Sequence, residues 1–129
     1  MTDDLIALAR RAVACPKWRL MPGMLTDEGR RVMQVWPDNL GIKWSHLLDN
    51  RVVRDADALP DLTDAATIGC LLALVRVAWS DECAYMMPQS MSGGGGWYFW
   101  ACPPGDGNSP RGVGQTEAEA MVAALESAP

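Results

Sequence analysis

The sequence has little of what catalytic, metal-binding and membrane-spanning proteins usually contain. Its 129 residues include one histidine and four cysteines, and no two cysteines have the Cys-x-x-Cys spacing from which structural zinc sites are usually built. The longest apolar run, residues 68–75, is too short for the roughly 20 residues that cross a bilayer. We therefore predict no metal, no cofactor and no membrane partner.

Two other features lack the neighbouring residues that a catalytic site or a phosphate-binding loop requires. The lone histidine, His46, shows no nucleophile and acid at a spacing that indicates a catalytic site. The glycine run at residues 93–96 is followed by Trp97, whereas a phosphate-binding loop requires a Lys-Ser or Lys-Thr pair after its glycines. We predict no catalytic residue and no enzymatic activity.

Positive charge is also scarce, since sixteen acidic residues outnumber eleven basic ones and give a formal net charge of −5. Free nucleic acid binds clustered lysines and arginines, so we predict no direct nucleic-acid binding. A basic protein surface suits an acidic protein better. The N-terminal residues are acidic and then apolar, whereas a secretory signal is basic and then apolar, so we expect a cytoplasmic protein. In that compartment we expect the cysteines to be buried and reduced, namely Cys15, Cys70, Cys83 and Cys102.

The clearest structural signal is a helix within residues 59–81. Apolar residues recur there at helical spacing, and Arg76 is the only charge between the first turn and the end of the helix. Thr63 is the predicted cap, and Asp64 places negative charge in the first turn, where the helix dipole favours it. The pattern predicts a helix that is buried almost all round.

Two further helices are predicted near the ends of the chain. Residues 3–15 follow a threonine cap and end at a proline. Residues 117–127 follow Gly114, which we interpret as a turn, and a capping box in which Thr116 and Glu119 satisfy each other's backbone donors. Ala118, Met121, Val122 and Leu125 form the predicted apolar face of this last helix.

Short alternating segments between turn residues predict strands at 18–21, 31–36, 40–45, 51–54, 83–87 and 97–100. We expect the last two to form an antiparallel pair. The predicted fold is a single α+β domain spanning residues 1–129, with three helices and an antiparallel sheet of about five strands in the order α-β-β-β-(β)-α-β-β-α.

Six tryptophans are the main anomaly of the composition. Each such ring buries roughly 150–250 Å² and needs a partner for its N–H, so a core of this size accommodates about three or four of them. In the aromatic run, Tyr98 and Trp100 alternate with Trp97 and Phe99, and we expect one of the two faces to be exposed. The alternative is a hydrophobic strand that the terminal helix covers.

Residues 59–79 and 112–129 resemble segments that recur in small, uncharacterised accessory proteins encoded by bacteriophages and prophages. The likeness lies in helix caps and core positions, so it implies a lineage and carries over no binding residue. With the acidic charge, it favours a protein-binding accessory protein in the infected host, specifically an inhibitor of a defence system such as a CRISPR effector. The predicted partner-binding residues are Tyr98, Trp100, Trp97, Asp55, Asp57 and Asp61.

Two other functions remain open at this point. A virion assembly protein, or a self-associating homodimer, would use the aromatic strand as the seam between copies. A small-ligand-binding domain would use a tryptophan-lined pocket between sheet and helices.

Overall fold

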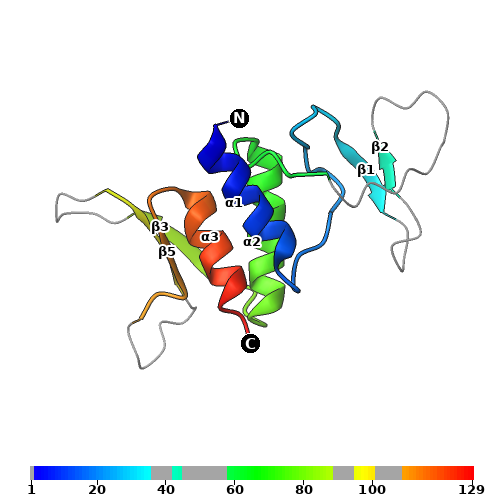
Figure 1. Cartoon of the computed structure of the whole chain (residues 1–129). Helices are drawn as coiled ribbons and strands as arrows, with labels where there is room; N and C mark the ends of the chain where they lie inside the picture. Colours follow the sequence, from blue (N-terminus) through cyan, green and yellow to red (C-terminus); the bar gives the residue numbers. More distant parts are fainter. Residues whose placement is uncertain (1, 36–41, 45–57, 89–94, 101–108) are drawn as a thin grey trace.

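In the computed structural model, three helices lie between two antiparallel β units (Figure 1). The structure describes residues 2–35, 42–44, 58–88, 95–100 and 109–129, with the backbone alone for 42–44. Along the chain the elements follow the order α1, β1, β2, α2, β3, β4, β5, α3. The predicted α+β class with three helices is confirmed.

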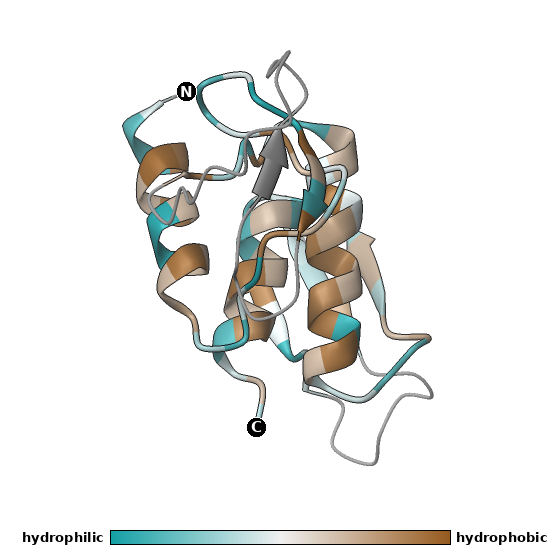
Figure 2. Cartoon of the chain, turned by 90° about the vertical axis from the view of Figure 1, so that its right-hand side faces the viewer, coloured by the Kyte–Doolittle hydropathy of each residue, from teal (hydrophilic) through white to brown (hydrophobic). Residues whose placement is uncertain are grey.

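Helix α1 spans Asp3–Ala14 and begins as predicted, because the hydroxyl of Thr2 accepts a hydrogen bond from the Leu5 N–H at 3.4 Å. Its acidic first turn and the arginine in its last turn both suit the helix dipole. Figure 2 shows hydrophobic residues alternating with hydrophilic ones along α1, beside the N-terminus. One side of α1 therefore faces the core and the other faces solvent.

Helix α2 spans Ala65–Ala78, and its cap differs from the prediction. Asp64 is the capping residue, since its carboxylate accepts a hydrogen bond from the Thr67 N–H at 2.9 Å. Thr63 instead donates its backbone N–H and hydroxyl to the carboxylate of Asp61, at 2.9 and 2.6 Å. Asp61 thus orders the turn that precedes the helix.

The expectation that α2 is buried almost all round is wrong on one side. Leu71, Leu74 and Val75 are buried, but Val77 is 64% exposed and Gly69 is also exposed. The buried positions lie three and four residues apart, so they form one stripe along the helix. Ile68, Leu72 and Ala78 are partly buried against the core, so Val77 is the large apolar residue of α2 that is open to solvent.

The first β unit pairs β1, Val32–Val35, with β2, Ile42–Trp44, in antiparallel fashion. Before β1 the chain turns at Gly29, which has φ 78°, a conformation that favours glycine. Residues 18–21 form no strand, which corrects that prediction. The predicted strand at 51–54 lies outside the described residues.

The second β unit is a three-stranded antiparallel sheet in the order β3-β4-β5, formed by Tyr85–Pro88, Trp97–Trp100 and Gly112–Gly114. The predicted pairing of the aromatic run with the segment before it is confirmed. β5 is an unpredicted strand, because Gly114 lies in the ladder rather than in a turn. The predicted sheet of about five strands is not confirmed: among the described residues, the strands belong to a two-stranded and a three-stranded sheet.

Helix α3 spans Glu117–Glu126 and Thr116 caps it as predicted, but Glu119 bonds to the backbone of the residue before the cap rather than to that of Thr116. The Thr116 hydroxyl accepts from the Glu119 N–H at 3.2 Å, while the Glu119 carboxylate accepts from the Gln115 N–H at 2.6 Å. The predicted apolar face is buried, and α3 packs against β4, β5, α1 and α2. α3 therefore connects the three-stranded sheet to the helical core.

The core takes side chains from all three helices and from β1 and β4, including Leu8, Val32, Leu71, Val75, Phe99, Met121 and Leu125. Of the cysteines in the described residues, Cys15 is buried, whereas Cys70 is half-buried and Cys83 is exposed, so the expectation of buried thiols holds only for Cys15. Cys102 lies outside the described residues. None of the described helices is long and apolar enough to span a membrane.

Candidate functional site

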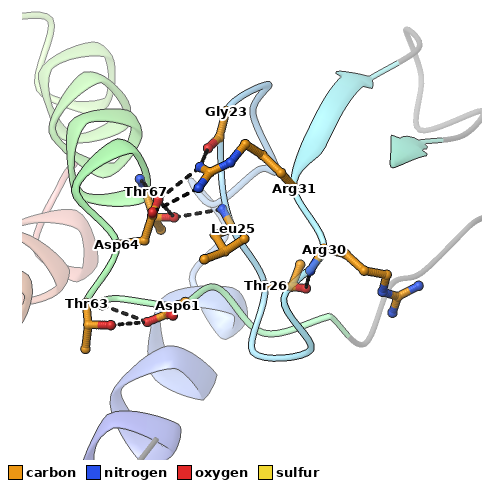
Figure 3. Close-up of polar contacts among 9 residues, drawn as sticks. All are labelled: Gly23, Leu25, Thr26, Arg30, Arg31, Asp61, Thr63, Asp64 and Thr67. Carbon is orange, nitrogen blue, oxygen red and sulfur yellow. Dashed lines mark hydrogen bonds and ion pairs between the residues drawn. The ribbon is translucent and has the colours of Figure 1, made fainter. Parts of the chain in front are cut away.

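A dense polar cluster joins the segment before β1 to the start of α2 (Figure 3). The Arg31 guanidinium donates to both carboxylate oxygens of Asp64, at 3.1 and 3.2 Å, and to the Gly23 carbonyl at 2.6 Å. The Thr67 hydroxyl donates to Asp64 at 3.0 Å and accepts from the Leu25 N–H at 2.8 Å. Each of these polar groups therefore has a hydrogen-bond partner within the cluster.

The pKa shifts and the burial of side chains in this cluster indicate a role in stability rather than in catalysis. The hydrogen bond from Arg31 is the largest influence on Asp64 and lowers the pKa of its carboxyl to about 2. Burial raises the pKa of the neighbouring Cys70 thiol, which disfavours the nucleophilic thiolate. Thr67 is fully buried, so its hydroxyl is closed to a substrate. We therefore assign the cluster a structural role.

The Asp64 interaction predicts a specific pH dependence of stability. A carboxyl whose pKa is lowered from 3.8 to about 2 on folding stabilises the protein above pH 3.8, and this contribution is lost as the pH falls toward 2. Asp64→Asn keeps a good cap but removes the charge, so it should cost about 1–2 kcal/mol at neutral pH, after allowance for solvent screening. Urea unfolding of both proteins between neutral pH and pH 2 measures this difference.

The matched control for this prediction is Glu126→Gln, which removes a carboxylate from the Arg11–Glu126 pair. Both partners of that pair are well exposed, so the substitution should change stability by less than about 1 kcal/mol. If the difference between wild type and Asp64→Asn stays constant down to pH 2, the Arg31–Asp64 pair is not the source of the stabilisation.

The three-stranded sheet has two chemically different faces, which the strand register defines. Cross-strand partners lie on the same face, and neighbours along a strand lie on opposite faces. Phe99 is paired with Met86 and Gly112, and a side-chain carbon at Gly112 would meet α3. This inner face therefore packs on α3, which agrees with Phe99 being fully buried.

The opposite face of this sheet, hereafter the outer face, is aromatic and aliphatic throughout. The register places Trp100 opposite Tyr85, and Tyr98 between Met87 and Val113. Tyr85, Met87 and Val113 are 37%, 48% and 52% exposed, so in the described part of the chain this face is open to solvent. Charged residues are absent from these positions, which is unusual for the solvent face of an antiparallel sheet.

The two aromatic residues at the centre of the outer face pack against each other. The rings of Tyr98 and Trp100 form an edge-to-face pair with centroids 5.7 Å apart, one of the preferred arrangements of aromatic side chains. The indole N–H of Trp100 is buried and has no acceptor in the residues that the structure describes. A buried donor without a partner costs roughly 1–3 kcal/mol, and the described residues alone do not satisfy this N–H.

The structure separates the residues that were predicted to bind a partner. Tyr98 and Trp100 share the outer face, whereas Trp97 lies on the inner face, on the same side as Phe99. Asp61 lies before α2, where its carboxylate is held by Thr63 and its backbone N–H donates to the Leu25 carbonyl at 2.8 Å. Leu25 belongs to the segment that leads into β1, and β1 lies across the helices from β3 and β5 (Figure 1). Asp55 and Asp57 lie outside the described residues. The aromatic residues and Asp61 therefore do not form one surface.

Sequence reasoning missed three contributors to the outer face, namely Tyr85, Met87 and Val113. Tyr85 and Met87 alternate with Met86 in a predicted strand, so their common face was available from the sequence. Val113 stands between two glycines and carried no strand signal. No group of three or more His, Cys, Asp or Glu side chains in the described ranges could hold a metal ion.

No protein-family model, no curated protein and no solved structure matches this chain. The resemblance of two segments to phage and prophage proteins therefore gains no support from comparison and stays a hypothesis. The argument for function rests on the geometry of the outer face.

Proposed function

We propose that this protein is non-enzymatic and acts by binding another protein through the outer face of the β3-β4-β5 sheet. The observation that carries this proposal is an uncharged sheet face on which Tyr85, Met87 and Val113 are exposed and the central pair, Tyr98 and Trp100, is half-buried. Contiguous exposed apolar surface is uncommon on soluble monomers and marks interaction sites. Tyrosine and tryptophan are also the residues that most often dominate binding energy.

The chemistry of the outer face indicates what the partner presents there. A face without charges gives no electrostatic attraction at its centre, so binding energy would come from burying apolar area against an apolar surface of the partner. The net charge of −5 is distributed elsewhere on the molecule and supports a partner whose surrounding surface is basic. The narrower hypothesis is a phage or prophage inhibitor of a host defence complex, acting in the host cytoplasm.

The test compares two lysine substitutions at positions with similar exposure. Val113→Lys places a charge on the outer face, whereas Met33→Lys places one on β1, where Met33 is 55% exposed against 52% for Val113. In affinity capture from a lysate of the source cell, a specific partner should be retained by wild type and by Met33→Lys and lost by Val113→Lys. Melting temperatures of all three proteins verify that each is folded.

With the partner purified, Tyr98→Ala should weaken binding by about 2 kcal/mol or more, roughly 30-fold, because truncation removes a central aromatic anchor. Isothermal titration calorimetry measures this change. Equal affinity for wild type, Tyr98→Ala and Val113→Lys would place the interface elsewhere. A twofold mass in solution that Val113→Lys abolishes would instead support the alternative, a homodimer or assembly protein with this face as its seam.

A further inference from the structure

A groove lies on the part of α2 that the core leaves uncovered, between the last turns of that helix and the segment that follows α1. Its volume is about 470 Å³. The groove combines an apolar floor with two cationic residues, and it is lined by Trp18, Leu74, Val77, Ala78, Lys17 and Arg19. None of these residues belongs to the outer face, so the groove is a separate surface.

The apolar part of the groove is accessible. Leu74 is buried and Trp18 is half-buried, while Val77, in the last turn of α2, is 64% exposed. A single aliphatic or aromatic side chain from another molecule could pack against Trp18 and Val77. Such a contact removes apolar surface from water on both sides, which favours binding.

The charged part of the groove carries two cations that nothing in the described chain neutralises. Lys17 and Arg19 are exposed, and the ion pairs of the described residues involve neither of them. In a chain of net charge −5, this local positive pair is complementary to an acidic ligand.

We propose that this groove binds a short acidic peptide segment of a partner protein, with carboxylates at Lys17 and Arg19 and one apolar side chain against Trp18 and Val77. A peptide fits better than a small molecule because both cations are exposed. Small-ligand sites instead bury most of the ligand and fix it with a few enclosed polar groups. This site is independent of the outer face and extends the protein-binding proposal to a second surface.

To test the proposal, the isotope-labelled full chain is titrated with a synthetic peptide in which glutamates flank one leucine. The titration is monitored by two-dimensional NMR. The Trp18 indole N–H and the amides of Val77 and Ala78 should shift in a saturable manner. Raising salt from about 25 to about 250 mM should weaken binding several-fold, because exposed charge pairs are screened. A peptide with glutamine in place of glutamate should bind at least about tenfold more weakly.

Matched substitutions assign the effect to the groove. Arg19→Gln should raise Kd at least about threefold, whereas Arg10→Gln removes the same charge from the exposed side of α1 and should leave Kd unchanged. Val77→Glu places a carboxylate in the groove at an exposed position, so it should abolish binding without unfolding the protein.

Three results would overturn the proposal. Equal weakening by Arg10→Gln and Arg19→Gln would show attraction to overall charge alone. Shifts centred on Tyr98 and Val113 would show that the peptide binds the outer face. Equal affinity for free glutarate would show a small-anion site rather than a peptide groove. None of these results would affect the partner capture that tests the outer face, so the two proposals can fail separately.

Discussion

Replacing Gly112 by alanine is expected to destabilise the protein by about 3 kcal/mol or more, and to lower its melting temperature by about 10 °C or more. Gly112 lies in β5 directly against α3. A methyl carbon at this position would lie 2.6 Å from the Ala124 nitrogen and closer still to the Ala120 carbonyl oxygen. Both are backbone atoms, so the added carbon fits only if the helix moves away from the strand.

The clash at Gly112 reflects how β5 and α3 are built. Gly112 and Gly114 share the inner face of the sheet, and alanines supply the helix side of the contact, with Ala120 and Ala124 fully buried. Small residues on both sides let the two backbones approach closely. Moving α3 would also disturb Phe99, which packs on the same face, so the cost extends beyond one contact.

Gly69→Ala is the matched control. Gly69 lies within α2, and a carbon added there meets nothing within 4 Å. Alanine at an open helical position should stabilise the protein by roughly 0.5–1 kcal/mol, since glycine loses more backbone entropy on folding. Thermal melts of both variants by circular dichroism should therefore move in opposite directions. A Gly112→Ala melt within a degree or two of wild type would mean that α3 does not pack this closely on β5.

Helix ends were predictable from sequence where the capping interaction is local. Thr2 and Thr116 cap α1 and α3 as expected, because each needs only residues within the next turn. At α2 the sequence offers Thr63 and Asp64 side by side, and both are good caps. Arg31, thirty-three positions earlier in the chain, pairs with Asp64, and such a distant contact leaves no local signal.

Strand β5 could not be predicted for a related reason. Gly-Val-Gly has low strand propensity, and glycine usually indicates a turn. These glycines are needed because α3 packs directly against them, and this contact between distant segments cannot be read from the local sequence. The same limit applies to the candidate site: alternation predicts that Tyr98 and Trp100 share a face, but only the register adds Val113 to them.

The outer face and the stable core are therefore two sides of one sheet. The glycines of β5 and the buried Phe99 of β4 fix the sheet on α3, and this attachment anchors the strands that carry the opposite face. A rigid aromatic surface loses little conformational entropy when a partner binds it. Variants that loosen the inner face should consequently weaken binding at the outer face, even where they touch no outer residue.

Leu71→Ala is the second large effect that we expect, with a loss of about 2–5 kcal/mol in the free energy of unfolding. Leu71 is fully buried in the middle of α2, so truncation removes buried apolar surface and leaves a cavity. Because a domain of this kind has roughly 5–15 kcal/mol of total stability, the variant should unfold at a much lower urea concentration. Urea titrations of wild type and Leu71→Ala, monitored by circular dichroism, measure the free energy of unfolding of each protein.

Two further substitutions in α2 test whether the loss of stability depends on how deeply the side chain is buried. Leu72 is half-buried, so Leu72→Ala should cost clearly less than Leu71→Ala, although the sequence alone gave no reason to distinguish them. Val77→Ala, at a position 64% exposed, should change stability by no more than about 0.5 kcal/mol. Equal losses at Leu71 and Leu72 would place the buried stripe of α2 on a different side of the helix.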